Sequence, residues 1–392
     1  MKMAEIKAHD LEMDLYSCAQ CGYCQNICPI YNEIPWESAS PRGKLYWIKS
    51  ILTTGFLRPN IEIDEDLVNR LFQCTLCGRC HEVCQTSLDA MGIWTSARAE
   101  AFKSGLRPKN LELIAGNLNG ETKNPYGLDP DMRLDWTDYT DLEDVPEEDE
   151  AEIAYFVGCT TAFKGANHAI GYSIATLLNH MEEDWTLLGE DEWCCGGPLI
   201  MSGDIEGAKA FAEHNISELE RRGVKVLLTG CPSCYRMWKF EIPELLGIEV
   251  DFEVKHGLEF INQRVEEGKL ELPGSEDVVT YHDPCELSRL AGVIDEPRGI
   301  LRRLSNRFVE MPENGMDVRC CGGGGLLQAS DNMLRMSIVK RRIEQAKSVG
   351  ADIITSACPA CNMTLLDGVR AMDENIEVLD LAEYIVQRLG LD

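Results

Sequence analysis

The sequence lacks long apolar runs and is poor in basic residues. No stretch approaches the roughly 18 consecutive apolar residues of a membrane-spanning helix, and the N-terminus has no apolar core of the kind found in secretion signals. There are 37 Lys and Arg residues against 66 Asp and Glu residues, which gives a net charge of −29. Such a charge repels the phosphates of nucleic acids. We therefore expect a cytoplasmic protein with no membrane span of its own and no nucleic-acid partner.

Isolated cysteines are missing as well. All 18 cysteines fall into motifs with short spacings, and none is left over. Cysteines of secreted proteins commonly form disulfides, but these spacings are typical of metal ligands and of thiolates kept reduced in a cytoplasm. The sequence therefore predicts that every cysteine binds metal and that the native protein has no disulfide bond.

Two runs near the N-terminus share one spacing. Each has the form Cys-x2-Cys-x2-Cys-x3-Cys, once at 18–28 and once at 74–84. This form resembles that of bacterial two-cluster ferredoxins, in which the fourth cysteine of each run serves the other cluster. The resemblance implies two cubane 4Fe-4S clusters, one held by Cys18, Cys21, Cys24 and Cys84 and the other by Cys74, Cys77, Cys80 and Cys28. Apolar residues at helical spacing in 41–52 and 64–72 predict an α-helical module around them.

The rest of the chain contains one five-cysteine pattern twice. A single cysteine is followed by a Cys-Cys pair and then by Cys-x2-Cys, at 159–234 and again at 285–361. The copies are offset by 126 residues for the first three cysteines and by 127 for the last two, which indicates an internal duplication. We call them the first cassette (Cys159, Cys194, Cys195, Cys231, Cys234) and the second cassette (Cys285, Cys320, Cys321, Cys358, Cys361).

Five thiolates exceed what a zinc ion binds. Zinc takes four ligands in a closed tetrahedron, whereas two adjacent thiolates can reach different irons of a polynuclear centre. The glycines that follow each pair allow the backbone to approach a cluster and to point its amides toward sulfide. The candidate cofactor-binding residues are therefore Gly196, Gly197, Gly322 and Gly323. The alternative is a pair of zinc sites with spare thiols.

The cassette spacing resembles that of the CCG domain in the catalytic subunit of methanogen heterodisulfide reductase and its relatives. This resemblance implies that each cassette holds a noncubane 4Fe-4S centre and that a substrate disulfide is cleaved between the two. The candidate catalytic residues are then Cys194, Cys195, Cys320 and Cys321. His282, shortly before Cys285, is a further candidate as a proton donor to a thiolate product, although a hydrogen bond that fixes its loop is the favoured role.

Strand and helix patterns alternate through both copies. Strands are predicted at 153–157, 224–229, 278–281 and 353–355, and helices at 166–180, 205–223 and 331–349. This alternation predicts mostly parallel sheets, with the cysteines at the carboxyl edge where such sheets place ligands. We expect an α+β multidomain protein with an α-helical ferredoxin module (1–113), an acidic linker (114–150) and two CCG domains (151–272 and 273–392) related by pseudo-twofold symmetry.

The whole architecture resembles that of the heterodisulfide reductase family in which a ferredoxin module is fused ahead of two CCG domains. The resemblance implies an iron–sulfur oxidoreductase subunit that takes electrons from a flavoprotein or a membrane cytochrome b and reduces a heterodisulfide of the CoM-S-S-CoB type. Such a partner would hold the protein in the cytoplasm or at the inner face of the membrane. The alternative is an electron-transfer subunit of a flavin-linked glycolate, lactate or glycerol-3-phosphate dehydrogenase that exchanges electrons with a quinone. Two complete cassettes favour the disulfide enzyme, because a conduit tolerates a degraded copy.

Basic residues gather in two short segments of this acidic chain. They are Arg298, Arg302, Arg303 and Arg307 in one segment and Lys340, Arg341 and Arg342 in the other. We expect ordinary ion pairs with the surplus carboxylates. The alternatives are binding of an anionic group of a substrate and docking of a partner protein.

Overall fold

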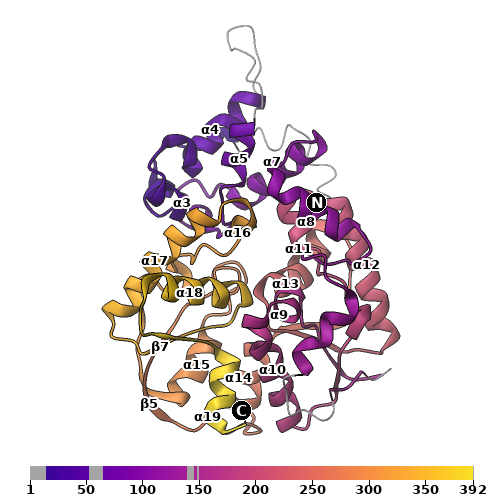
Figure 1. Ribbon diagram of the computed structural model, residues 1–392. Helices are drawn as coiled ribbons and strands as arrows, with labels where there is room; N and C mark the ends of the chain where they lie inside the picture. The colour runs from indigo at the N-terminus through magenta and orange to yellow at the C-terminus, as the bar shows by residue number, and fades with distance from the viewer. Residues whose placement is uncertain (1–14, 53–64, 139–144, 148–149, 392) are drawn as a thin grey trace.

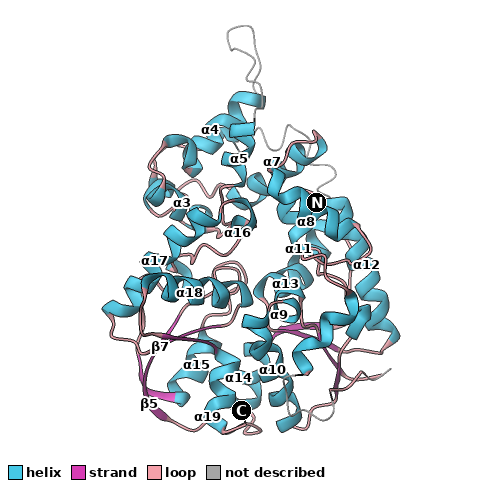
Figure 2. Cartoon of the chain, viewed as in Figure 1, coloured by secondary structure: helices cyan, strands magenta, loops and turns pink. Residues whose placement is uncertain are grey.

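The computed structural model describes residues 15–52, 65–138, 145–147 and 150–391. A helical module at the N-terminus lies above two α/β halves that stand side by side (Figure 1), and the strands are confined to these halves (Figure 2). The α+β multidomain class predicted from the sequence is confirmed. Within the described residues, no helix combines the length and the apolar character needed to cross a membrane.

The N-terminal module is built from short helices joined by cysteine-bearing loops. Its helices are α2 (Tyr23–Asn26), α3 (Pro29–Glu33), η2 (Glu37–Ala39), α4 (Pro41–Leu52), α5 (Glu65–Phe72), α6 (Arg79–Glu82), α7 (Ala90–Lys103) and α8 (Lys109–Asn119). Cys28 is the N-cap of α3, and Pro29 at the first helical position presets its backbone angle. Asp89 caps α7 by accepting a hydrogen bond of 3.0 Å from the Gly92 amide. The sequence-predicted helical character of the module is therefore correct.

The first half is a parallel four-stranded sheet in the order β2-β1-β3-β4. Its strands are β1 (Ile153–Tyr155), β2 (Trp185–Thr186), β3 (Val226–Thr229) and β4 (Glu253–His256). Its helices are α9 (Cys159–Phe163), η4 (Gly165–Asn167), α10 (His168–His180), η5 (Gly189–Asp191), α11 (Gly197–Ser202), α12 (Ile205–Arg221), α13 (Pro232–Arg236), the π-helix η6 (Met237–Leu246) and α14 (Gly257–Glu266). Every residue of β1 is buried, as expected for a strand inside a parallel sheet.

The second half repeats this topology, with strand order β6-β5-β7-β8. Its strands are β5 (Ser275–Tyr281), β6 (Ser305–Phe308), β7 (Ile353–Ser356) and β8 (Glu377–Asp380), and its helices are α15 (Asp295–Leu304), η7 (Gly315–Asp317), α16 (Leu327–Ser330), α17 (Asn332–Ser348), α18 (Pro359–Met372) and α19 (Leu381–Leu389). The last helix of each half even begins with the same capping box, formed by His256 and Glu259 in one half and by Asp380 and Glu383 in the other.

The two halves pack on each other reciprocally. Helix α10 of the first half contacts α19 of the second, and α15, which is equivalent to α10, contacts α14, which is equivalent to α19. Reciprocal contacts of this kind are the mark of a twofold relation. One continuous hydrophobic core joins the halves, with Tyr155 and Leu258 from the first and Tyr281 and Tyr384 from the second.

The segment between the module and the first strand is partly ordered by packing. Helix α8 continues to Asn119, beyond the start of the predicted linker, and η3 (Pro130–Thr137) follows later. Trp136 in η3 is fully buried, with its ring centroid 6.5 Å from that of Tyr155. Part of the acidic run, at 141–144 and 148–149, lies outside the described residues. The segment therefore belongs structurally to the first half.

Candidate iron–sulfur centres

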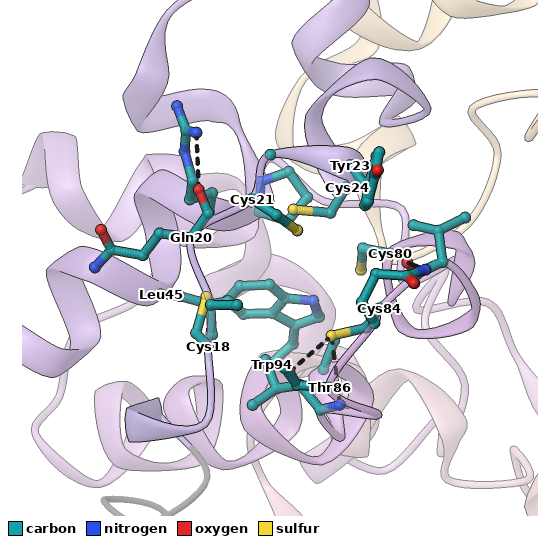
Figure 3. Close-up of a pocket in the computed structure, with 18 residues that line it drawn as sticks. Cys18, Gln20, Cys21, Tyr23, Cys24, Leu45, Cys80, Cys84, Thr86 and Trp94 are labelled. Carbon is teal, nitrogen blue, oxygen red and sulfur yellow. Dashed lines mark hydrogen bonds between the residues drawn. The ribbon is translucent and has the colours of Figure 1, made fainter.

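The first four-cysteine site is a pocket at the outer end of the N-terminal module. Figure 3 shows the sulfur atoms of its cysteines around a common space beside the Trp94 ring. The cysteines that line it are Cys18, Cys21, Cys24 and Cys84, with Cys80 at its border. The structure thus brings the fourth cysteine of the second run to the first run, as the crossed-ligand prediction requires. The Cys84 sulfur accepts a hydrogen bond of 3.4 Å from the Leu88 amide, a contact that favours a thiolate.

The second four-cysteine site is an adjoining pocket lined by Cys28, Cys74, Cys77 and Cys80. It shares Cys80 and Trp94 with the first pocket, so the two sites are neighbours. Burial raises the pKa of the Cys28 thiol to about 12, and the ammonium of Lys44 opposes this shift. Lys44 is buried beside the pocket and donates to the Gln73 carbonyl at 2.5 Å. Its positive charge can offset the negative charge of a thiolate-bound cluster.

Both cassettes open into one cavity of about 350 Å³ between the two halves. All ten of their cysteines line this cavity: Cys159, Cys194, Cys195, Cys231, Cys234, Cys285, Cys320, Cys321, Cys358 and Cys361. Four of them follow the ends of parallel strands, because β1, β3, β5 and β7 each lead directly into a cassette loop. The carboxyl edge predicted from the sequence is therefore where these thiols lie.

Each cassette divides into two groups of thiols in the same way. The first member of the Cys-Cys pair contacts the single cysteine, as Cys194 does with Cys159 and Cys320 with Cys285. The second member contacts the Cys-x2-Cys motif. Thus Cys195 contacts Cys234, and the sulfurs of Cys321 and Cys361 lie 3.5 Å apart. The pair therefore bridges two ligand groups, which suits a centre with more than one iron.

The second cysteine of each Cys-Cys pair has a lowered pKa. Hydrogen bonds from Cys194 and then Cys234 lower the pKa of Cys195 to about 6, against burial. Hydrogen bonds from Cys320 and then Cys361 lower the pKa of Cys321 well below its ordinary value. The same member of each pair is therefore the one that most readily becomes a thiolate, the form that binds metal.

The two glycines that follow the Cys-Cys pair of the second cassette donate hydrogen bonds from their backbone amides to cysteine sulfurs. The Gly322 amide donates to the Cys320 sulfur at 3.3 Å, and the Gly323 amide donates to the Cys321 sulfur at 3.4 Å. A side chain at Gly158 would place a Cβ 3.1 Å from the Cys234 sulfur. These features fit thiolate-bound iron–sulfur clusters. They are the ten cysteine thiols, the amide hydrogen bonds to sulfur and the close approach of the backbone to the Cys234 sulfur.

The first cassette has a buried ion pair that the sequence did not predict. Arg133, from η3 in the linker, donates to Glu192 at 2.6 Å and lies 3.6 Å from the Cys159 sulfur. Glu192 in turn accepts from the Val157 and Gly158 amides at 3.0 and 2.9 Å. The guanidinium therefore places a positive charge against a candidate ligand. No motif could reveal it, because Arg133 reaches the site only through the path of the linker.

A histidine, His282, lies beside the cysteines of the second cassette. A ring nitrogen of His282 lies within 4.8 Å of the sulfurs of Cys321 and Cys361. Its Nδ1 accepts a hydrogen bond of 3.0 Å from Nε of the buried Arg342. Because that guanidinium can only donate, Nε2 carries the ring proton. Burial, with a smaller effect from Arg342, lowers the pKa of His282 to about 3, so the ring is a neutral donor at physiological pH.

The N-terminal module contacts the second cassette directly. Cys77 of the module is in hydrogen-bond contact with Cys320, and Arg289 donates to the Cys77 carbonyl at 2.7 Å. Arg98 of α7, fully buried, donates to the carbonyls of Cys74 at 3.0 Å, of Met201 at 2.8 Å and of Gly325 at 3.2 Å. A single guanidinium thus joins the module to both halves.

The expected ion pairs of the basic segments are present in part. Arg298 pairs with Asp283 at 2.8 Å and with Glu310 at 2.7 Å, and Arg341 pairs with Glu33 at 2.7 Å. Arg342 instead contacts His282, as described above. None of the seven basic residues lines the cavity among the residues described.

Comparisons with known proteins agree with this organisation. Residues 153–239 and 279–366 both match the model of a cysteine-rich domain, CCG, and residues 14–88 match that of a 4Fe-4S dicluster domain. A hypothetical protein from Helicobacter pylori shares the fold, with a TM-score of 0.56 and 11% identity over 99% of this chain and 74% of that one.

Curated relatives cover nearly the whole chain. The D subunit of the dihydromethanophenazine:CoB–CoM heterodisulfide reductase of Methanosarcina acetivorans is 36% identical, covering 97% of this chain and 95% of that protein. Its counterpart in Methanosarcina mazei is 34% identical with equal coverage. The EtfAB:quinone oxidoreductase of Syntrophomonas wolfei is 26% identical over 95% of this chain but 58% of its own length. The chain therefore belongs to the family of iron–sulfur proteins formed by the D subunits of heterodisulfide reductases.

Proposed function

We propose that this chain takes electrons through two cubane clusters in its N-terminal module and delivers them to two noncubane centres in the cassettes, where a thiol heterodisulfide of the CoM-S-S-CoB type is reduced. The reaction is RS–SR′ + 2 e⁻ + 2 H⁺ → RSH + R′SH. The observation that carries the proposal is the single cavity lined by both complete cassettes. A relay that only conducts electrons has no need for two complete ligand sets around one space.

The cavity suits a small disulfide. Iron–sulfur clusters held by the cassettes would supply one electron from each side of the cavity, matching the two electrons that the cleavage requires. Apolar side chains of Pro198, Met201, Leu326 and Met363 line part of the remaining wall. An apolar surface of this kind would limit the access of water to a sulfur–sulfur bond held between the two Cys-Cys pairs.

Electron entry is supported at the far end of the N-terminal module. Cys21 is exposed there. Tyr23, which lines the first pocket, is also exposed, as are three further aromatic side chains of the module: Tyr16, Trp36 and Tyr46. Exposed aromatic side chains are typical of protein-binding surfaces. From the first pocket the route passes the shared Cys80 and Trp94 to the second pocket, and the Cys77–Cys320 contact leads to the second cassette. The partner would be a flavoprotein or a membrane cytochrome b.

The second candidate is a relay between a flavoprotein and a quinone. The similarity to the EtfAB:quinone oxidoreductase favours it. In that case the cavity would have no substrate of its own, and one damaged cassette would leave electron transfer to a quinone largely intact.

The decisive assay is disulfide reduction by the anaerobically purified protein, with reduced methyl viologen as donor. Cys195→Ser and Cys321→Ser should each abolish turnover, because each removes the bridging thiol of one cassette. Reduction of the cubanes, followed by electron paramagnetic resonance, should survive in both. Met333→Ser, at an exposed position of α17, is the control and should leave turnover unchanged.

Metal analysis tests the cofactor assignment separately. Four clusters of four irons predict about sixteen iron and sixteen sulfide per chain. A content near eight, or stoichiometric zinc, would rule out two noncubane centres. If either cysteine variant keeps near-normal turnover, cleavage between two centres is wrong. If the wild type reduces a quinone analogue readily but no disulfide, the relay is correct.

A further inference from the structure

Charged side chains are rare around the cavity between the cassettes. Among the described residues that line it, the charged ones are Lys164 and Glu286. Glu286 is already engaged, because it accepts a hydrogen bond from the Ser233 hydroxyl and pairs with Arg236 at 3.4 Å. An anionic group that enters the cavity therefore meets Lys164 as its available cation.

Lys164 has no carboxylate partner within the part of the chain that the structure describes. Its ammonium instead lies 4.1 Å from the ring centroid of Tyr126, a cation–π contact that positions the charge without neutralising it.

Two hydroxyl groups, from Tyr126 and Thr160, line the cavity beside Lys164. The Tyr126 hydroxyl and the Thr160 hydroxyl are 3.0 Å apart, and both residues line the cavity. When one hydroxyl donates to the other, the proton of the accepting hydroxyl remains free to donate to a ligand. The cluster of Lys164, Tyr126 and Thr160 therefore offers a positive charge and a hydrogen-bond donor together.

The second copy of the duplicated sequence has no basic residue at the position equivalent to Lys164. With the offset of 126 residues, Leu290 is the counterpart of Lys164 and Arg289 that of Phe163. In the second half these positions are covered by the N-terminal module. Arg289 binds the Cys77 carbonyl, and Leu290 packs so closely on Gly78 that a Cβ there would lie 2.5 Å from it. In the second half, the region around Leu290 is therefore occupied by the module that would deliver electrons under the proposed function.

We propose that Lys164, with Tyr126 and Thr160, binds an anionic group of the disulfide substrate, such as a sulfonate, phosphate or carboxylate. The substrate then enters from the side of the first cassette, with its sulfur–sulfur bond directed toward the cysteine pairs. This inference rests on the proposed function, but it makes a separate claim about ligand charge that binding measurements can test without turnover.

The test compares two disulfides of similar size. The probe 2,2′-dithiodiethanesulfonate carries a sulfonate at each end, and 2-hydroxyethyl disulfide is its neutral counterpart. Binding to the oxidised holoprotein is measured by calorimetry without an electron donor, and KM and kcat are then measured with reduced methyl viologen. The variants are Lys164→Gln, Lys164→Arg and, as control, Lys340→Gln at an exposed position of α17 that does not line the cavity.

Lys164→Gln should weaken binding of the sulfonate probe roughly tenfold, as expected for loss of one charged contact. Its KM should rise by a similar factor with little change in kcat, and binding of the neutral disulfide should change less than about twofold. Lys164→Arg should retain most of the affinity, and Lys340→Gln should behave as wild type. Lys164 is half-buried at the surface of the cavity, so these variants should fold normally.

The outcomes separate the two proposals. The anion site is refuted if the wild type binds the sulfonate disulfide and the neutral disulfide with equal affinity. It is also refuted if Lys164→Gln has the same affinity as the wild type for both disulfides. Either result refutes the site even when disulfides are reduced. If sulfonate binding depends on Lys164 but no disulfide is turned over, the anion site stands and the proposed reductase function fails.

Discussion

Replacing His282 with phenylalanine would test whether the two cassettes differ electronically. The 126-residue offset makes Phe156 the counterpart of His282 in the first half, so this duplicated fold already accommodates phenylalanine at that position. The substitution removes a neutral imidazole whose tautomer is held by Arg342 at 3.0 Å. It therefore deletes one N–H donor beside Cys321 and Cys361. It also leaves Nε of the buried Arg342 without its acceptor, which should lower the free energy of unfolding by about 1–3 kcal/mol.

The upper bound of the effect is the energy of the one hydrogen bond that Nε2 of His282 would donate to a ligand sulfur of a bound cluster, since that nitrogen has no other partner among the residues that the structure describes. A bond to a charged group contributes about 1.5–3 kcal/mol, and roughly a third to a half of this is gained when the acceptor becomes more negative on reduction. For a one-electron couple about 59 mV corresponds to about 1.4 kcal/mol. We therefore expect His282→Phe to lower the reduction potential of the second centre by about 20–60 mV, because hydrogen bonds to ligand sulfurs stabilise the reduced state.

The assay is a redox titration followed by electron paramagnetic resonance. For the set of clusters proposed above, one noncubane signal should move to lower potential, whereas the other noncubane signal and both cubanes should stay within about 10 mV of the wild type. His180→Phe, at an exposed position of α10, is the control and should shift none. A shift of both noncubane signals, or of neither, would refute a local effect of His282 on the second centre.

Two further predictions concern ligation and stability. Cys84→Ser should damage the cluster of the first pocket and leave that of the second, since Cys84 lines the first pocket; spectroscopic loss of the second cluster alone would overturn the crossed pairing. Burial lowers the pKa of His256 to about 3, whereas the unfolded residue titrates near 6.5, so protons bind preferentially to the unfolded chain in this window. The free energy of unfolding should therefore fall as the pH drops below about 6.5, by at most about 1.4 kcal/mol per unit from this residue. His256→Asn should flatten the pH dependence of the guanidinium midpoint, whereas His180→Asn should not; equal slopes for both variants would contradict the assignment.

Cysteine spacing and apolar periodicity predicted much of the fold. The pattern at 205–223, with Asp204 before it, matches α12 and its cap, in which Asp204 accepts from the Gly207 amide at 2.9 Å. The strands before Cys231 and Cys358 are also where the patterns indicated. Local sequence suffices in these cases because period and capping are properties of neighbouring residues.

The missed parts of the site depend on tertiary packing. Arg133 reaches Cys159 because Trp136 buries η3 against the first half, and neither residue lies in a cysteine motif. Lys164 has no sequence signal beyond its position five residues after Cys159, and its role as the available cation emerges only once Glu286 is seen to be paired. Comparing the two copies position by position could have drawn attention to Lys164, because its counterpart Leu290 is apolar.

The continuous core between the halves determines how molecules can reach the cavity. Swinging the halves apart would expose apolar side chains such as Tyr155, Tyr281 and Tyr384 to water, at about 25 cal/mol for each square ångström of apolar surface uncovered. The reciprocal helix pairs α10–α19 and α14–α15 would be broken together. Separating the halves to admit or release a ligand would therefore be costly. For the function proposed above, we expect the disulfide and its two thiol products to pass through the existing mouth of the cavity, with side-chain rearrangement there, rather than a hinge motion, setting the rate of exit.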